Sequence, residues 1–178
     1  MQRITTLTVN TTSGQAHTQL TNLKQAMGSE VNLFGALANS PAALQGFLNF
    51  KGSLDKGTLT KLQAEQLGLA IAGVNGCRYC ASAHSFISEK LGLSADEIKA
   101  NLNATSTDSK TNALLGFAKN VIEQRGRVSQ EQIQSVKDAD FSDEQLVEVI
   151  AHIALNTFTN YFNEAFDIEI DFPKVELA

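Results

Sequence analysis

Hydrophobic residues recur every three or four positions through most of the chain, which is the period of one face of an α-helix. Helix start signals divide this pattern into segments. Ser40 precedes Pro41 in the order typical of a helix N-terminus, and the segments starting at Ser94, Ser129 and Ser142 each carry Glu or Gln three residues later, as in a capping box. The pattern predicts helices over residues 15–27, 31–39, 41–55, 59–75, 77–91, 95–103, 108–125, 130–139 and 143–166.

Alternating apolar and polar residues, the pattern of a β-strand, occur only near the two ends of the chain, over residues 4–9 and 168–172. We interpret both segments as extended tails. No internal repeat, low-complexity tract or interdomain linker interrupts the helices between them. The sequence therefore predicts a single all-α domain over residues 1–178.

Two of the predicted helices differ from ordinary surface helices. Residues 62–74 are apolar on nearly every side, Leu62 included, which predicts a central position. The last helix carries an apolar stripe on one side and a polar stripe at helical spacing on another, and a buried polar stripe needs hydrogen-bonding partners. The apolar stripe comprises Leu146, Ile150, Ile153 and Thr157, and the polar stripe comprises His152, Asn156, Thr159 and Asn163. We interpret His152 as a hydrogen-bonded core or interface histidine rather than a catalyst.

Composition narrows the class of protein. With 178 residues, 43% of them hydrophobic, the chain is long enough to bury one core. Its 19 acidic and 14 basic residues give a net charge of -5, which argues against a nucleic-acid partner, because affinity for phosphate requires clustered Lys and Arg. No run of 18 apolar residues and no secretory signal pattern is present. We therefore expect a cytoplasmic protein with no membrane segment.

The two cysteines, Cys77 and Cys80, lie three residues apart. A disulfide between them closes too small a loop to stabilise the fold appreciably. In a reducing compartment, this spacing is more often catalytic or metal-binding than structural.

The sequence around these cysteines predicts a helical hairpin. Asn75 and Gly76 form a turn signal that ends one helix, so a second helix begins near Cys77. On that second helix, steps of three and four residues place five side chains on one inward stripe. These side chains are Cys77, Cys80, His84, Ile87 and Leu91.

The positions of residues along the two helix axes of the hairpin place a carboxylate near this stripe. With a rise of about 1.5 Å per residue from Gly76, Glu65 lies roughly 16 Å back along the first helix and His84 roughly 12 Å along the second. Glu65 can then orient the far side of the imidazole. His84 is also one turn from Cys80, within reach of a hydrogen bond.

These residue types suit thiol chemistry. The thiolate is the nucleophile, and a nearby imidazole and a helix N-terminus both promote its ionisation. The helix dipole favours Cys77 as the nucleophile, whereas the position of His84 one helical turn from Cys80 favours Cys80. We predict that Cys80 attacks and that Cys77 resolves a sulfenic acid on Cys80 to a disulfide.

Other readings of the same residues stay open. Both cysteines can be buried small hydrophobes. They can also join His84 in a zinc site, although a second ligand pair is missing. A distant Lys or a backbone group can satisfy Glu65, and Arg78 and Tyr79, which lie off the stripe, are expected to be solvent and packing residues.

The spacing Glu65-x11-Cys77-x2-Cys80-x3-His84 resembles the signature of the AhpD-like alkylhydroperoxidase branch of the carboxymuconolactone decarboxylase superfamily. Three further segments look like the peroxidase-related members, so the resemblance extends over about residues 32–173. These segments are 32–34, 37–42 and 154–163. One departure is Tyr79, which stands where AhpD itself has a histidine.

The resemblance implies an AhpD-like helical bundle whose central hairpin carries the Cys-x-x-Cys pair, in an obligate oligomer that is commonly a trimer or hexamer. It implies a thiol peroxidase or disulfide reductase in which Cys80 attacks the peroxide, Cys77 resolves, and His84 with Glu65 relays the proton. The namesake decarboxylases lack the cysteine pair, which argues against lactone decarboxylation here.

We therefore expect a cytoplasmic homo-oligomeric enzyme that reduces hydroperoxides through a Cys77–Cys80 disulfide. It needs no metal or flavin cofactor, only an external thiol or lipoyl-type reductant. One alternative is a non-catalytic redox-sensing or interaction module. The other is a zinc-binding helical domain.

Overall fold

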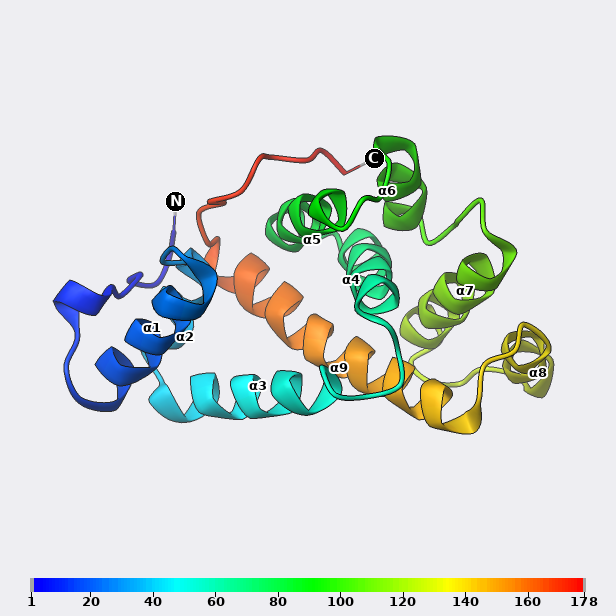
Figure 1. Cartoon of the computed structure of the whole chain (residues 1–178), viewed down its shortest axis with the longest axis horizontal. Helices are drawn as coiled ribbons and strands as arrows, with labels where there is room; N and C mark the ends of the chain where they lie inside the picture. Colours follow the sequence, from blue (N-terminus) through cyan, green and yellow to red (C-terminus); the bar gives the residue numbers. More distant parts are fainter. Residues whose placement is uncertain (1, 178) are drawn as a thin grey trace.

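Helix α4 (Lys61–Asn75) lies at the centre of the molecule and packs against four other helices (Figure 1). Residues 66–72 of α4 are buried, as the apolar pattern predicts. Leu62 differs, because it is 37% exposed in the first turn, before α4 enters the core. The central position of α4 confirms the prediction from the sequence.

The structure is a computed structural model and describes residues 2–177. All regular structure in this range is helical, so the predicted all-α class is confirmed. Every predicted helix is present, with its ends within two residues of the expected positions. The remaining elements are the 3-10 helix η1 (Val9–Thr11), α1 (Gly14–Met27), α2 (Asn32–Leu37), α3 (Pro41–Leu54), α5 (Arg78–Lys90), α6 (Ala95–Leu102), α7 (Ser109–Glu123), α8 (Gln130–Asp138) and α9 (Asp143–Phe166).

The predicted helix caps form, with one exception. Ser129 and Ser142 each make the complete capping box. Ser94 accepts from the backbone N–H of Glu97, but the Glu97 carboxylate does not bond back to the cap. It instead accepts from Asn101 and from the loop before α7, and these contacts fix the α6–α7 connection.

The long helix α9 crosses the molecule beneath α4 and beside α3 (Figure 1). Its polar stripe faces inward, and His152, Asn156, Thr159 and Asn163 are all buried. The expected apolar stripe is only partly buried. Leu146 and Ile153 pack with α4 residues in one core cluster, whereas Ile150 is 46% exposed.

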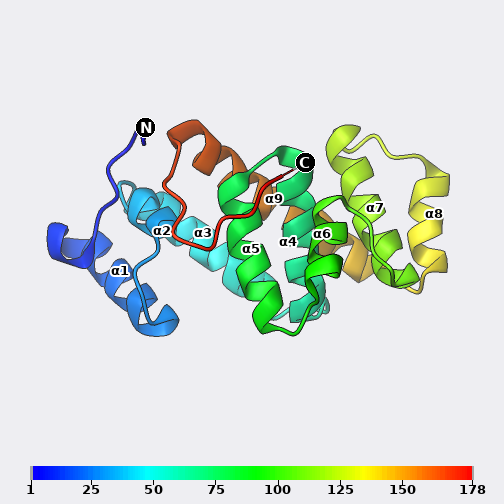
Figure 2. The ribbon, with the colours of Figure 1, turned by 90° about the horizontal axis from the view of Figure 1, so that it is seen from above.

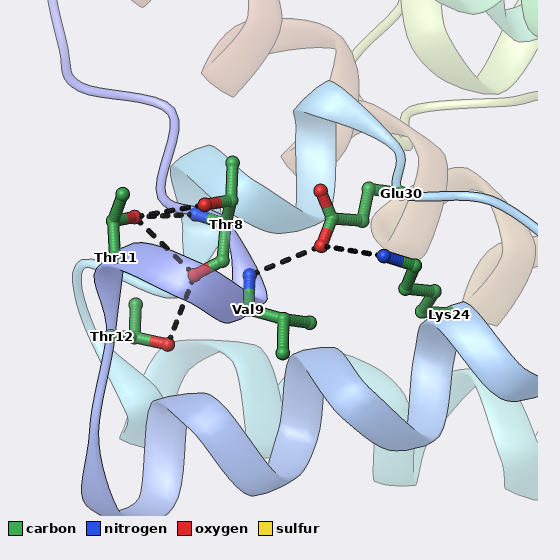
Figure 3. Close-up of polar contacts among 6 residues, drawn as sticks. All are labelled: Thr8, Val9, Thr11, Thr12, Lys24 and Glu30. Atoms are coloured by element: carbon green, nitrogen blue, oxygen red, sulfur yellow. Dashed lines mark hydrogen bonds and ion pairs between the residues drawn. The ribbon is translucent and has the colours of Figure 1, made fainter.

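Polar contacts attach the N-terminal segment to the body (Figure 3). The Val9 backbone N–H donates to Glu30 Oε1 at 3.1 Å, and Lys24 Nζ lies 3.5 Å from the same oxygen. Thr8, the N-cap of η1, bonds to Thr11 at the end of that helix. No strand forms over the described residues 4–9, as expected, but Val9 begins η1, so the segment is not extended to its end.

The C-terminal strap, residues 168–177, is also extended and runs across α5 toward α6 (Figures 1 and 2). The backbone N–H of Val175 donates to Ser82 Oγ at 3.1 Å. The Asp171 carboxylate accepts from Tyr79 Oη at 2.7 Å and from the Asn32 backbone N–H at 2.8 Å. The strap therefore joins α2 and α5 on the face where the cysteines lie. None of the described helices is both long and apolar enough to cross a membrane.

Candidate active site

The hairpin of α4 and α5 positions the two cysteines. Helix α4 ends at Gly76, which has a φ of 72° and so adopts the left-handed conformation expected of the turn signal. Cys77 is the N-cap of α5, and its Sγ accepts from the backbone N–H of Cys80 at 3.2 Å. The helix therefore begins one residue later than predicted, with a sulfur atom as its cap.

Both cysteines are free thiols, and their sulfur atoms lie 2.8 Å apart. Cys77 is completely buried. Cys80 is 4% exposed, and it lines a cavity that Cys77 does not line. Of the two cysteines, Cys80 is therefore the one at the cavity, and the Cys77 sulfur is in contact with it.

His84 and Glu65 form the contact expected from the hairpin geometry. His84 Nδ1 lies 2.7 Å from Glu65 Oε2. Gly68 provides the space for the imidazole, because a Cβ atom at this position would lie 2.6 Å from Nδ1. A glycine inside an apolar helix is thus part of the site, a role that the sequence pattern did not reveal.

Electrostatics favour a charged His84–Glu65 pair. Burial opposes charge on both groups, but the opposite charge of the partner and the hydrogen bond outweigh it. As a result, the pKa of Glu65 is lowered and the pKa of His84 is raised. The imidazole is held as a proton donor beside the thiols.

The expected hydrogen bond between Cys80 and His84 does not form. His84 Nε2 instead donates to Asn156 Oδ1 at 3.1 Å, and the Asn156 amide is oriented by its own bond to the backbone oxygen of His152 at 2.9 Å. Asn156 comes from the polar stripe of α9 and takes the Nε2 proton that Cys80 was expected to accept. His84 therefore acts on Cys80 through its charge.

Cys80 Sγ is surrounded by donors. Its pKa is lowered to about 7, first by the hydrogen bond from Cys77, against the effect of burial, and then by the charge of His84 and the amides of Asn163 and Asn160. Asn163 Nδ2 lies 3.2 Å from the sulfur. Donating to Cys80, together with burial, raises the pKa of Cys77. Cys80 is therefore the thiolate of the pair.

Asn156 and Asn163 contact His84 and Cys80, but the analysis of motifs did not include them in the site. The signal for them was the polar stripe, which predicted a polar partner without identifying it. That partner is the pair formed by Cys80 and His84.

A cavity of about 180 Å³ opens over Cys80 and His84. Its walls are mainly apolar, and the polar groups among them include the oppositely charged Lys51 and Asp55 as well as Glu65, His152 and Asn156. The apolar walls include Leu33, Phe34, Phe47, Ile87, Leu155 and Phe172. The site therefore suits a small apolar ligand better than a highly charged one.

Tyr79 forms part of the cavity wall. Its hydroxyl accepts from the Leu33 backbone N–H at 3.2 Å and donates to Asp171, and its ring meets Phe172 edge-on with centroids 5.8 Å apart. Burial, together with Asp171, raises the pKa of Tyr79, so the phenol stays protonated. This agrees with the packing role expected of Tyr79, and Arg78 is exposed as expected.

The predicted inward stripe of α5 ends earlier than expected. Cys80, His84 and Ile87 line the cavity, but Leu91 is 37% exposed, because it follows the last helical residue and lies beyond the neighbouring helices. Another face of α5 is buried through its serines, Ser82, Ser85 and Ser88. Small side chains there allow α6 and the C-terminal strap to approach closely.

A zinc site lacks ligands here. Within residues 2–177, no three His, Cys, Asp or Glu side chains are grouped so that they could hold a metal ion. The Cys77 and Cys80 sulfur atoms contact each other, the Asn163 amide of α9 donates to Cys80, and Glu65 bonds to His84.

Part of the chain matches a known family, and solved structures share its fold. Residues 41–124, which include Glu65, both cysteines and His84, match the model of the carboxymuconolactone decarboxylase family. No curated protein matches the chain. Among solved structures, the alkylhydroperoxidase AhpD core of an uncharacterised peroxidase-related protein from Ralstonia eutropha JMP134 has a TM-score of 0.84 at 23% identity, covering 96% of this chain and 92% of that chain.

Two further structures share the fold. An uncharacterised peroxidase-related protein from Silicibacter sp. TM1040 has a TM-score of 0.76 at 18% identity, covering 84% of this chain and 81% of the other. The debrominase Bmp8, solved as a cysteine-to-alanine variant in complex with 2,3,4-tribromopyrrole, has a TM-score of 0.73 at 20% identity. The match covers 88% of this chain and 86% of the debrominase. Residues 41–124 therefore match the carboxymuconolactone decarboxylase family, and the chain has the fold of the AhpD-like structures.

Proposed function

We propose that this protein is a thiol-dependent hydroperoxide reductase that cycles between a Cys77–Cys80 dithiol and disulfide. The observation that carries the proposal is the position of Cys80. Its sulfur lines an apolar cavity, has a second thiol 2.8 Å behind it, and lies beside the charged pair of His84 and Glu65. A nucleophile, a resolving group and a proton donor thus occupy one site.

In the first step, the Cys80 thiolate attacks the outer oxygen of a hydroperoxide ROOH. An S–O bond forms and the O–O bond breaks, with its electron pair leaving on the alkoxide. The His84 imidazolium protonates the alkoxide to the alcohol ROH, and Glu65 stabilises the imidazolium before transfer. The Cys80 sulfur is oxidised by two electrons to a sulfenic acid, and the peroxide is reduced to the alcohol.

In the second step, the Cys77 sulfur attacks the sulfenic acid. The S–S bond forms, the S–O bond breaks, and the hydroxide leaves as water with the proton of the Cys77 thiol. An external dithiol, such as a lipoyl group, then returns two electrons and two protons to the disulfide and is itself oxidised. The cycle requires no bound metal or flavin.

The sequence-based expectations of a cytoplasmic location and of a trimeric or hexameric assembly are part of this proposal. The alternative of a non-catalytic redox sensor shares the same thiol chemistry. It differs in turnover, because a sensor is oxidised once and then changes its assembly.

The direct test is the intact mass of the reduced protein after one equivalent of cumene hydroperoxide, followed by thiol alkylation under denaturing conditions. We expect rapid loss of both alkylation sites and their recovery with a dithiol. The Cys77→Ser variant should stop at a sulfenic acid, which dimedone traps, and Cys80→Ser should not react. Two thiols still fully alkylated in the wild type would contradict the proposal, and oxidation without turnover would favour the sensor.

Reductive dehalogenation is a second candidate, because the debrominase shares the fold and the cavity here is apolar. The Cys80 thiolate would take bromine from a brominated ring as the ring gains a proton. Cys77 would then displace bromide and form the same disulfide. Release of bromide from 2,3,4-tribromopyrrole, faster than reduction of cumene hydroperoxide, would favour this function over the first.

A further inference from the structure

Most polar residues around the cavity already have partners or are enclosed. Lys51 bonds to Asp55 at 2.8 Å, and Glu65 bonds to His84. His152 is buried, as predicted, but its Nε2 atom has no hydrogen-bonding partner within residues 2–177, so the predicted hydrogen bond is wrong for this atom. That atom is itself buried and does not face the cavity. Which molecules reach the reacting sulfur therefore depends on the shape of the apolar walls.

Three of these walls are joined through one carboxylate. Phe172 in the C-terminal strap, Tyr79 in α5 and Leu33 in α2 all line the cavity. Tyr79 Oη donates to Asp171 at 2.7 Å and accepts from the Leu33 backbone N–H at 3.2 Å. The second oxygen of Asp171 accepts from the Asn32 backbone N–H at 2.8 Å. Asp171 does not itself line the cavity, but it connects the three elements whose side chains do.

Phe172 is the residue of the strap that contributes to the cavity wall. Its ring meets Tyr79 edge-on, and its centroid lies 5.8 Å from that of Phe86 in the same helix. It also packs against the apolar cluster that contains both cysteines. Because Phe172 directly follows Asp171 in the chain, the hydrogen bonds of Asp171 fix the position of this ring.

The strap has few other attachments as it runs over α5 (Figure 2). Within the described chain, its remaining hydrogen bonds to the body join Glu169 to Gln2 and Asn32, and Val175 to Ser82. Several of its residues are exposed, namely Glu169, Asp171, Pro173, Lys174 and Glu176. An extended segment with few buried contacts opens locally at a lower cost in free energy than a packed helix.

The closed cavity limits the size of a reagent. Its volume of about 180 Å³ is similar to that of a cavity that holds one benzene ring, roughly 150 Å³. A small hydroperoxide therefore fits, whereas a molecule with several fused rings does not fit unless a wall moves. Cys80 is only 4% exposed, so its sulfur offers a large molecule almost no surface while the walls are in place.

We infer that Asp171 is a positioning residue that holds Phe172 in the cavity wall and thereby restricts access to Cys80 to small molecules. Larger molecules reach the sulfur only when the strap moves. The inference rests on the proposed function, because it takes Cys80 as the reacting sulfur. It adds the size class of the substrate and the residue that sets it.

Two maleimides that share a reactive group and differ in size provide the test. The reduced protein is alkylated with N-ethylmaleimide or N-(1-pyrenyl)maleimide, and adducts at Cys80 are followed by peptide mass spectrometry. We expect the wild type to prefer N-ethylmaleimide more strongly than free N-acetylcysteine does. In Asp171→Ala, this preference should fall about tenfold, since a hydrogen bond to a charged group is worth about that factor in an equilibrium constant. Both reagents use the same thiolate, so a change in the pKa of Cys80 cancels in the ratio of rates.

Asp171→Asn is the matched variant, because its single acceptor oxygen can keep one of the two bonds to Tyr79 and Asn32. Its preference should lie between those of the wild type and Asp171→Ala. Phe172→Ala removes the wall and leaves the carboxylate, so it should lower the preference as well. Lys174→Ala, at an exposed position of the same strap, should leave it unchanged.

A wild-type preference in folded Asp171→Ala would overturn the inference, and so would equal acceleration of both maleimides in that variant. The same holds if the wild type prefers N-ethylmaleimide no more than free N-acetylcysteine does. Asp171→Asn and Phe172→Ala keep the test valid if Asp171→Ala folds poorly. The proposed function is judged separately, by thiol oxidation with cumene hydroperoxide in the wild type.

Discussion

At the scale of single residues, the chemistry depends on keeping a buried sulfur ionised. Removing a thiolate from water is costly, and Cys80 is only 4% exposed. The cost is offset by the Cys77 thiol, the Asn163 amide and the positive charge of His84. Each donor therefore contributes to the pKa of Cys80, and the removal of each can be measured.

We predict that Asn163→Leu raises the pKa of Cys80. In the wild type, the rate of iodoacetamide alkylation should reach half its maximum near pH 7 and fall below it, because the reactive thiolate becomes protonated. In the variant, the midpoint should move to higher pH, since the amide no longer stabilises the negative form. Asn101→Leu is the control, because this buried α6 asparagine bonds to Glu97 and Thr105. A wild-type midpoint in Asn163→Leu would contradict the assigned contact.

We predict that Glu65→Gln slows oxidation of Cys80 by cumene hydroperoxide by roughly 10²-fold, the low end for loss of acid–base catalysis. Without the carboxylate, the pKa of His84 falls, so the ring loses its proton at neutral pH and no longer stabilises the thiolate. Stopped-flow rates and the NMR titration of His84 measure both effects. Glu97→Gln, on the α6–α7 connection, should leave both unchanged. An unaltered His84 titration in Glu65→Gln would show that the pair is not coupled.

At the scale of elements, the site depends on the close approach of α4 and α5. Gly68→Ala places a methyl group where the His84 ring lies, so the ring must turn away from Glu65. We predict at least a tenfold loss of thiol oxidation rate with the helical fold retained. Gly116→Ala in α7, where the new Cβ meets nothing within 4 Å, is the matched control. It should keep full activity and gain up to about 1 kcal/mol of stability.

Element-scale features were largely predictable from the sequence, because their causes are local. Caps and helical periodicity determined the helix ends, and the turn at Gly76 together with a constant rise per residue brought Glu65 to His84. The wrong predictions concern which face of a helix is covered by neighbouring helices. Leu62, Ile150 and Leu91 are exposed because α4 and α9 are covered on other sides and α5 ends at Lys90. Such packing depends on the whole fold.

The residues missed at the site have the same explanation. Asn156 and Asn163 lie more than seventy residues from the cysteines in the chain, so nothing in the local sequence pairs them with Cys80 or His84. Gly68 shows no pattern of its own, because its role is to leave space for another residue. Sequence spacing predicted the cysteines, His84 and Glu65. The residues that surround them and adjust their pKa values could be identified only from the fold.

At the scale of the whole molecule, α9 presents a row of large apolar side chains to solvent on the side away from α4. Its members lie at helical spacing and are between 43% and 70% exposed: Val147, Ile150, Phe158 and Tyr161. Contiguous exposed apolar surface of this kind is typical of sites where proteins associate. We therefore expect copies of the chain to meet on this face in the predicted homo-oligomer.

The double variant Val147→Glu, Tyr161→Glu should reduce the molar mass measured by light scattering toward 19.2 kDa, the mass of one chain. Buried carboxylates without partners disfavour association. Lys119→Glu combined with Lys137→Glu, which changes charge on α7 and α8, should leave the assembly intact. The same mass for the double variant of α9 and the wild type would place the interface elsewhere.

The hydrogen bonds that Cys80 receives from Cys77, the N-cap of α5, and from Asn163 also affect the reduction potential of the cysteine pair. The donors around Cys80 stabilise a negative charge that exists only in the dithiol form, and once the disulfide forms they have no anion to bind. A dithiol stabilised in this way makes its disulfide a stronger oxidant. The oxidised protein should therefore draw electrons readily from a modestly reducing dithiol. The hydrogen bonds that prepare the sulfur for attack also make its regeneration favourable.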